Sequence, residues 1–504
     1  MRDVVIGSSQ LTFDDVVQVA RYDAPVSITD GVLEQVRKNR SIIDEMARSD
    51  VAVYGVSTGF GALESQPISK ELRTQLQKSL IRSHAAGVGA FVETEVVRAM
   101  MFLRLKTMAS GRTGVRAEVL TTYQALLNVH ITPAVKEFGS LGCSGDLAPL
   151  SQCALALMGE GEVWNRDGEL VSSASALAEA GISPLELVEK EGLALINGTD
   201  GMLGMLILAL TDIATLLDAA DVIAAMSVDG LMGTNAVFRD QVHELRPHTG
   251  QQISAKRMFS VLKDSGILAS HSVDDTRVQD SYSLRCAPQV HGAVRDTLSH
   301  AARVAEIELH SVIDNPVILD DQTLASNGNF HGAPIAYVLD FLAIALTDLG
   351  SIAERRTDRL LDHHRSFGLP PFLAEDAGVD SGLMIAQYTQ AGLVSENKRL
   401  SVPASVDSIP TSAMQEDHVS MGWHAARKLR KVIDNSFYIF AVELTAASRA
   451  IDLRAPSKPS KIVQELMERF REVVPGVGPD RYLGPELEAA EQFVRTTPWR
   501  SIVS

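Results

Sequence analysis

The sequence predicts a mainly α fold, in which a long central helix bundle joins a smaller mixed α/β N-terminal region that carries the candidate active-site loops. Two observations support this class. Long apolar segments recur at the three-to-four-residue spacing of a helix, and strand-like alternation is confined to short pieces. The chain has 504 residues, of which 45% are hydrophobic and 22% are charged, so it is long enough to bury a large core.

Strands are predicted only in short stretches of the N-terminal region. These are "DVVIG" at residues 3–7, "VAVYGV" at 51–56 and "EVWNRDGELVSS" at 162–173. The last stretch has a turn signal at Asp167-Gly168 between two alternating runs, which predicts a hairpin.

Helices account for most of the remaining pattern. A first one is predicted by Val97, Met101, Leu105 and Met108, which recur before Gly111. The longest apolar segment spans residues 201–227 and is long enough to cross a membrane. Three aspartates, Asp212, Asp218 and Asp221, would then lie at bilayer depth at high cost, so we predict a helix buried inside a protein bundle.

Two more long helices follow. One covers residues 294–312 and ends before Asp314-Asn315-Pro316, and the other covers 423–453 and ends before Arg454-Ala455-Pro456. The proline-rich stretches "GLPPFL" and "RAPSKPSK" predict turns.

These elements suggest three regions along the chain. Residues 1–195 form the N-terminal region, 196–455 the long-helix bundle and 456–504 a C-terminal helical region.

Charge and cysteine content limit the classes of function. The chain carries 46 basic and 63 acidic residues, a net charge of −17, which argues against nucleic acid or an anionic membrane as a partner. Its three cysteines form no C-x-x-C pair, so neither a disulfide framework nor a structural zinc site is predicted. His363 and His364 are adjacent and do not share a helix face, and no metal site is expected. The start, "MRDVVIGSSQ", has no secretion signal, and a cytoplasmic setting is expected.

Polar, glycine-rich loops concentrate the residues with chemical uses. They lie at residues 53–63, 82–89, 142–149, 195–201, 279–289, 326–332 and 415–421. In "GSLGCSGDLAPLS", Ser144 lies in a near match to the nucleophile elbow G-x-S-x-G, but Asp146 replaces the last glycine and no base for the serine is evident. A serine hydrolase is therefore a weak hypothesis.

Four residues in these loops have both a functional and a structural interpretation. Tyr54 beside a glycine loop is placed like an acid/base on a lid, although the loop is equally a tight turn. Arg285 suits a substrate carboxylate or a structural ion pair. His84 is either a site residue or a core histidine, and Glu416 either a site residue or a helix cap.

Taken together, the loops resemble those of the aromatic amino acid ammonia-lyase family over nearly the whole chain. The matching motifs, in order, are "YGVSTGFG", "SHAAGVG", "SGDLAPLS", "LINGT", "QDSYSLRC", "NGNFHG", "SENK" and "PASVDSIPTSAMQEDHVSM". In this family the tripeptide that corresponds to Cys143-Ser144-Gly145 cyclises and loses two waters to give a methylidene-imidazolone (MIO). The resemblance implies that Ser144 is a precursor of this electrophile, that Asp146 assists its formation and that no external cofactor is needed.

The resemblance also implies roles for the other site residues. Tyr54 would remove the β-proton, Tyr282 would assist near the prosthetic group, and Glu416 would be the third catalytic side chain. The implied substrate-binding residues are His84, Asn197, Gln279, Arg285 and Phe330. Family members are homotetramers in which more than one subunit builds each pocket.

Substrate choice is expected to depend on Ser83-His84 and Glu416. Polar partners suit an imidazole, so the resemblance implies deamination of L-histidine to trans-urocanate and ammonia, the first step of histidine degradation. The alternatives are a tyrosine or phenylalanine ammonia-lyase, an aminomutase, and a non-catalytic scaffold, which would not require these residues together. Cys143 and Asp200 depart from the alanine and glutamine common in the family.

Overall fold

Helices dominate the computed structural model, which describes residues 2–49, 55–59, 61–63, 66–272 and 277–503. The mainly α class is confirmed. The described residues fall into two compact units that are discontinuous in sequence: unit 1 contains residues 1–208, 302–339 and 403–427, and unit 2 contains 209–301, 340–402 and 428–504. The three contiguous regions expected from the sequence divide the chain differently and stay a prediction.

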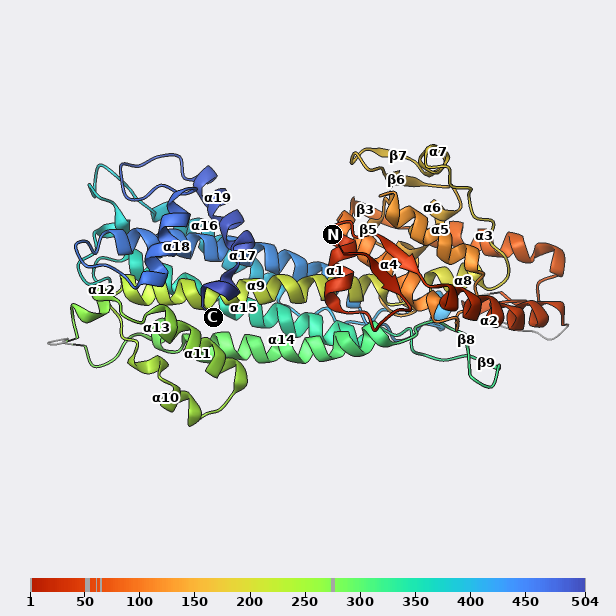
Figure 1. The fold of residues 1–504 in the computed structure, drawn as a ribbon, viewed down its shortest axis with the longest axis horizontal. Helices are drawn as coiled ribbons and strands as arrows, with labels where there is room; N and C mark the ends of the chain where they lie inside the picture. The colour runs from red at the N-terminus through yellow and green to blue at the C-terminus, as the bar shows by residue number, and fades with distance from the viewer. Residues whose placement is uncertain (1, 50–54, 60, 64–65, 273–276, 504) are drawn as a thin grey trace. The chain divides into compact units, whose positions relative to one another are not determined.

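Unit 1 holds the short strands and many short helices (Figure 1). Its elements are β1 (Val4–Ile6), α1 (Phe13–Arg21), β2 (Val26–Ile28), α2 (Asp30–Arg48), η1 (Gly61–Leu63), η2 (Lys70–Leu72), α3 (Arg73–His84), β3 (Val88–Phe91), α4 (Thr94–Ala109), α5 (Ala117–Asn128), β4 (Thr132–Pro133), β5 (Lys136–Phe138), α6 (Leu147–Leu157), β6 (Glu162–Trp164), β7 (Leu170–Ser172), α7 (Ser173–Glu179), α8 (Glu191–Ile196), β8 (Val317–Ile318), β9 (Leu324–Ala325) and η5 (Ser412–Met414).

Short pairings arrange these strands. β1 and β2 are parallel, whereas β3–β5, β4–β6, β6–β7 and β8–β9 are antiparallel. The predicted hairpin is confirmed, because β6 and β7 pair with Trp164 opposite Leu170 around the Asp167-Gly168 turn. The predicted strand at 51–56 lies largely outside the described residues.

Four long helices contain residues of both units. They are α9 (Asp200–Gly230), α14 (Ala287–His310), α15 (Ala333–Leu361) and α17 (Gly422–Asp452). The helices predicted at 201–227, 294–312 and 423–453 correspond to α9, α14 and α17, and the one around Val97 to α4, so these helices are confirmed. The bounds of α9 and α17 agree within a few residues, whereas α14 begins at Ala287, earlier than predicted. The fourth long helix, α15, was not predicted.

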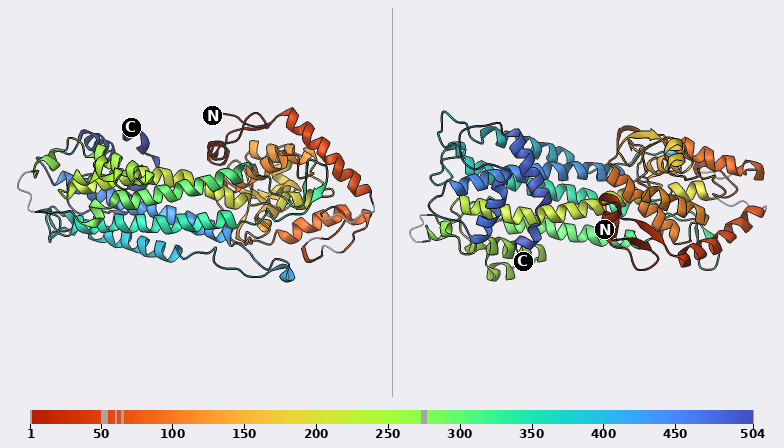
Figure 2. Two further views of the ribbon diagram at one scale, coloured as in Figure 1. Left: turned by 90° about the horizontal axis from the view of Figure 1, so that it is seen from below. Right: turned by 45° about the horizontal axis from the view of Figure 1, so that its top comes forward.

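Within unit 2, the segments of the four long helices run side by side, and shorter helices pack around them (Figures 1 and 2). Its other elements are η3 (Ala236–Phe238), α10 (Asp240–Glu244), α11 (Thr249–Val261), α12 (Gly266–Ala269), α13 (Tyr282–Arg285), η4 (Pro371–Leu373), α16 (Met384–Leu400), α18 (Lys461–Arg471), α19 (Gly484–Thr496) and α20 (Trp499–Ile502).

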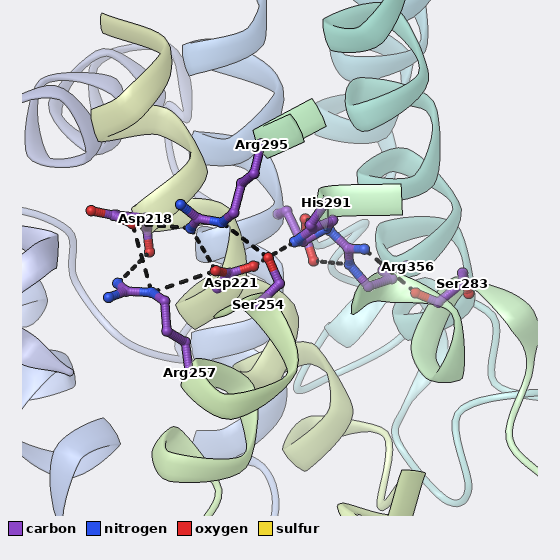
Figure 3. A network of polar contacts seen from close by, with 9 residues as sticks. Asp218, Asp221, Ser254, Arg257, Ser283, His291, Arg295 and Arg356 are labelled. Carbon is purple, nitrogen blue, oxygen red and sulfur yellow. Dashed lines mark hydrogen bonds and ion pairs between the residues drawn. The ribbon is translucent and has the colours of Figure 1, made fainter. Parts of the chain in front are cut away.

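A buried ionic network links α9 to α14 inside unit 2 (Figure 3). Asp221 accepts hydrogen bonds from His291 Nδ1 at 2.9 Å and from Arg295 Nη2 at 2.7 Å, and Arg295 also reaches Asp218 at 3.0 Å. Burial raises the pKa of Asp221, but Arg295 and His291 outweigh it and hold that pKa at about 2. Asp221 is therefore an ionised side chain whose partners compensate its burial.

This network explains how the apolar helix α9 tolerates Asp218 and Asp221. By length and composition alone, the helical stretch Glu191–Gly230 and helix Ala333–Leu361 are apolar enough to cross a membrane. A core helix of a soluble protein has the same properties, and 72% of the most apolar window of the first stretch is buried inside the protein. The partners of Asp221 fit the predicted burial within a protein bundle.

Candidate active site

The glycine-rich loop around Ser144 is held in unit 1 by backbone hydrogen bonds from two distant segments. The amide of Met421 donates to the carbonyl of Leu141 at 2.9 Å, and the amide of Gly332 donates to that of Gly142 at 2.9 Å. The Ser420 hydroxyl donates to the same Gly142 carbonyl at 2.7 Å. Three of the polar loops recognised in the sequence therefore converge here.

Gly145 occupies a position that only glycine fits. Its φ of +74° lies in the left-handed region, and a β-carbon there would overlap the backbone of Gly198. The amide of Asp146 donates to the Gly198 carbonyl at 2.7 Å, which brings the two loops into direct contact. The backbone at Gly145 therefore packs against Gly198 with no room for a side chain.

Asp146 is fully buried directly behind this loop. Its Oδ1 accepts from the Ser140 hydroxyl at 2.9 Å, and its Oδ2 accepts from the amides of Gly201 and Met202 at 2.9 and 3.0 Å. Burial raises the pKa of Asp146 to about 7, although these hydrogen bonds oppose the shift. The carboxyl therefore exchanges its proton near neutral pH while it ties the loop to the first turn of α9.

The side chains of Cys143 and Ser144 both point to Glu416. The Ser144 hydroxyl donates to Oε1 at 2.7 Å, and the Cys143 thiol donates to Oε2 at 3.2 Å. Burial, together with the Glu416 carboxylate, raises the pKa of the Cys143 thiol to about 12, so this sulfur stays a protonated donor at neutral pH. Asn197 Nδ2 donates to the Ser144 carbonyl at 2.9 Å. In the described part of the chain no imidazole is hydrogen-bonded to the Ser144 hydroxyl, so the Ser-His pair of a serine hydrolase is not found there.

A pocket of about 680 Å³ opens in front of these residues. Among the residues predicted for the site, it is lined by His84, Cys143, Ser144, Asn197, Phe330 and Glu416. His84 ends α3 and lies partly buried in the pocket wall, where burial lowers its pKa. The His84 side chain therefore lines the pocket, and the alternative interpretation of His84 as a histidine of the hydrophobic core is wrong. Glu416 does not cap α17, which begins six positions later at Gly422, so that alternative is also wrong.

Three predicted residues belong to unit 2 and do not line this pocket. Gln279 is exposed, and Tyr282 and Arg285 are the two ends of α13. The Tyr282 side chain is 71% exposed, and the Arg285 guanidinium lies 4.7 Å from the centre of its ring. Within the described residues Arg285 makes no ion pair with a carboxylate, so the structural ion pair that was its alternative role is not observed. Tyr54 lies outside the described residues.

The departure at Asp200 lies behind the pocket and not in its wall. Its carboxylate faces Arg104 Nη1 at 3.3 Å, and both side chains are almost completely buried. Burial raises the pKa of Asp200, which the Arg104 charge opposes. Arg104 Nη2 also donates to the Ile313 carbonyl at 2.8 Å. Asp200 is therefore an ion-pair partner at the start of α9, next to the turn that Asp146 holds.

Sequence reasoning missed two features near the site. Thr411, which lies in the same quoted motif as Glu416 but was not singled out, donates its hydroxyl to Glu416 Oε2 at 2.9 Å. Lys190 and Asp314 form a fully buried ion pair at 2.6 Å, and the Lys190 amide donates to the carbonyl of Gly55 at 3.1 Å. The sequence signal at Asp314-Asn315-Pro316 indicated only the end of a helix. Among the described residues no group of three or more His, Cys, Asp or Glu side chains is arranged to hold a metal ion.

Comparison with known proteins places this site in a family. The sequence profile described as aromatic amino acid lyase matches residues 11–472. A histidine ammonia-lyase of Streptomyces coelicolor is 60% identical over 496 residues, which are 98% of this chain and 97% of that protein. The crystal structure of a tyrosine aminomutase from Streptomyces globisporus superposes with a TM-score of 0.93 at 38% identity, covering 100% of this chain and 98% of that one.

A histidine ammonia-lyase from Trypanosoma cruzi has a TM-score of 0.92 at 36% identity, covering 100% of this chain and 95% of that one. The resemblance that the loop motifs indicated is thus confirmed over the full length. The chain belongs to the aromatic amino acid lyase family and is an ammonia-lyase.

Proposed function

We propose that this enzyme deaminates L-histidine without oxidation, giving trans-urocanate and ammonia, as the first step of histidine degradation in the cytoplasm. The observation that carries the proposal is one pocket in which a carboxylate, Glu416, and an imidazole, His84, lie beside the Cys143-Ser144-Gly145 loop. The 60% identity to a protein named histidine ammonia-lyase supports the same substrate.

The prosthetic electrophile of this proposal is an MIO ring made from the chain itself. The Gly145 nitrogen bonds to the Cys143 carbonyl carbon, and that oxygen leaves as water with the amide hydrogens of Ser144 and Gly145. The Ser144 hydroxyl then leaves as a second water with its Cα hydrogen. The positive φ of Gly145 and its close approach to Gly198 fit this cyclisation, because a side chain there would block it.

Asp146 is suited to move protons during these two dehydrations. Its pKa of about 7 allows it to give and accept a proton at neutral pH, and it lies one residue from the reacting backbone. Asn197 would hold the Ser144 carbonyl in place through the hydrogen bond at 2.9 Å. The finished ring would supply the strong electrophile that no side chain provides for activating an amine.

The pocket lining supports roles for Glu416, His84 and Phe330, whereas the role of Tyr54 rests on the family resemblance. Glu416 and His84 would hydrogen-bond the imidazole, and phenylalanine would leave these polar groups unpaired. Phe330 would pack beside the prosthetic group, and Tyr54 would remove the β-proton.

We assign Gln279, Tyr282 and Arg285 to the pocket of a neighbouring subunit in a homotetramer, where Arg285 would hold the substrate carboxylate. The absence of an ion pair at Arg285 among the described residues agrees with this role.

A tyrosine-specific aminomutase or lyase is the second candidate, because the tyrosine aminomutase of Streptomyces globisporus has the same fold at a TM-score of 0.93. An aminomutase would return the ammonia to the β-carbon. The polar pair at His84 and Glu416 favours histidine over this alternative.

Substrate and prosthetic group are tested together by mixing the purified enzyme with L-histidine and following the near-ultraviolet absorbance of urocanate. L-Tyrosine and L-phenylalanine are run in parallel, and Ser144→Ala is the control. Urocanate formation that the variant loses, with an intact mass that shows two waters missing from the wild type only, supports the proposal. Coumarate or cinnamate as the main product would refute histidine as the substrate.

A subunit-mixing experiment tests the shared pocket. Ser144→Ala and Arg285→Ala are each expected to be inactive as pure tetramers. Mixed tetramers contain some pockets with both wild-type residues if the two residues come from different chains, so co-expression restores part of the activity. Mixed tetramers without activity would assign both residues to the same chain.

A further inference from the structure

Among the described residues, the Glu416 carboxylate has three hydrogen-bond donors, divided unequally between its two oxygens. Oε2 accepts from the Thr411 hydroxyl at 2.9 Å and from the Cys143 thiol at 3.2 Å. Oε1 accepts only from the Ser144 hydroxyl, at 2.7 Å, among the described residues. Donors on both oxygens restrict the orientation of the carboxylate.

Thr411 is held in place by the backbone of the loop that also carries Glu416. The Thr411 amide donates to the Glu416 carbonyl at 3.0 Å, and the Glu416 amide donates back to the Thr411 carbonyl at 3.3 Å. The turn η5 at Ser412–Met414 closes this pair of hydrogen bonds. This backbone pairing keeps the Thr411 side chain within hydrogen-bonding reach of the Glu416 carboxylate.

The donors differ in what happens to them when the ring forms. The Thr411 hydroxyl takes no part in the cyclisation, and the Cys143 thiol remains as a substituent. The Ser144 hydroxyl, in contrast, leaves as water. Oε1 then loses this donor. The partly buried Glu416 lines the pocket together with His84, so the vacated acceptor position lies where a ligand can reach it.

We propose that Thr411 is a positioning residue that, with the Cys143 thiol, holds Glu416 by Oε2, and that the dehydration of Ser144 releases Oε1 to accept the N–H of the substrate imidazole. This inference rests on the proposed function. Formation of the electrophile and formation of the imidazole-binding site are then the same event, so the pocket recognises histidine only when it is able to react with it.

The test measures equilibrium binding in the Ser144→Ala background, where the serine hydroxyl is absent and no ring forms. The probes are trans-urocanate, which has an imidazole, and trans-cinnamate, a planar acid of similar shape with a phenyl ring. Calorimetric titrations compare Ser144→Ala alone with its combinations with Thr411→Val and Thr411→Ser. Valine keeps the shape of threonine without the donor, whereas serine keeps the donor.

The Thr411→Val combination is expected to bind urocanate about tenfold more weakly, the usual size of one hydrogen bond to a charged group. Cinnamate binding should be unchanged, and Thr411→Ser should restore urocanate binding. Circular dichroism of each variant, and the loss of two waters by the Thr411→Val single variant, check that the loop still folds.

Three results would overturn the inference. The first is the same affinity for urocanate whether position 411 is valine or threonine. The second is an equal loss of affinity for urocanate and cinnamate in the Thr411→Val combination, and the third is no binding of urocanate by Ser144→Ala although the wild type forms urocanate from L-histidine. Failure of the proposed function is a different result, in which the wild type forms no urocanate from L-histidine.

Discussion

Replacing Asp146 by asparagine should remove a pH-dependent loss of stability. Asparagine has nearly the same shape, its oxygen can accept from Gly201 and Met202, and its amide can donate to the Ser140 hydroxyl. The variant therefore keeps the hydrogen bonds of the protonated aspartic acid but has no charge to bury.

The size of the effect follows from the pKa of about 7 in the folded protein against an ordinary value of 3.8. Between these values the folded state holds a proton that the unfolded chain has lost, so the free energy of unfolding falls as pH rises and levels off above pH 7. At 1.36 kcal/mol per pKa unit the full loss is about 4 kcal/mol, of which about 2–3 kcal/mol falls between pH 5 and pH 8.

Urea unfolding followed by far-ultraviolet circular dichroism measures this difference. Both proteins carry Ser144→Ala, so that ring formation does not alter the comparison, and the exposed acid Glu179, changed to glutamine, is the control. The stability of the Asp146→Asn variant relative to its parent should rise by about 2–3 kcal/mol from pH 5 to pH 8. A constant difference across this range would show that Asp146 is already ionised at pH 5 and would remove the basis for its role in proton transfer.

Three other changes have defined outcomes. Gly145→Ala should prevent the loss of two waters, seen by intact mass, because its β-carbon meets the Gly198 backbone, and a variant that still dehydrates would refute this argument. Arg356→Met should lower the free energy of unfolding in urea by about 3–5 kcal/mol, because it leaves the fully buried Glu443 carboxylate without its ion-pair partner. A loss below about 1 kcal/mol would mean that water reaches this carboxylate. His84→Leu should lower kcat/KM for L-histidine at least about tenfold by removing a polar partner of the imidazole, and an unchanged value would exclude His84 from substrate recognition.

Much of the fold was predictable because the relevant signals are local. The three-to-four-residue spacing of apolar residues indicated α4 and α14, the long apolar segments indicated α9 and α17, and the Asp167-Gly168 turn indicated the β6–β7 hairpin. The division of the described residues into two discontinuous units was not predicted, because it depends on which distant segments pack together.

The candidate site was predicted in part for a similar reason. The loop motifs identified His84, Ser144, Asn197, Phe330 and Glu416, and the structure brings them to one pocket. The structural alternatives for His84 and Glu416 were rejected only by the positions of their side chains. Thr411 lies in the same motif as Glu416 but was not singled out, because its importance comes from a hydrogen bond to the Glu416 side chain.

The sequence by itself determined the mainly α class, the positions of α9 and α17, the hairpin and the Cys143-Ser144-Gly145 tripeptide, because each of these depends on neighbouring residues. Only the tertiary structure decided that Ser144 meets Glu416, 272 positions away, and that Asp146 is buried deeply enough for its pKa to reach about 7. Hydrogen bonds between distant segments and the desolvation of a carboxyl both depend on how the chain packs, and residue spacing carries no direct signal for either.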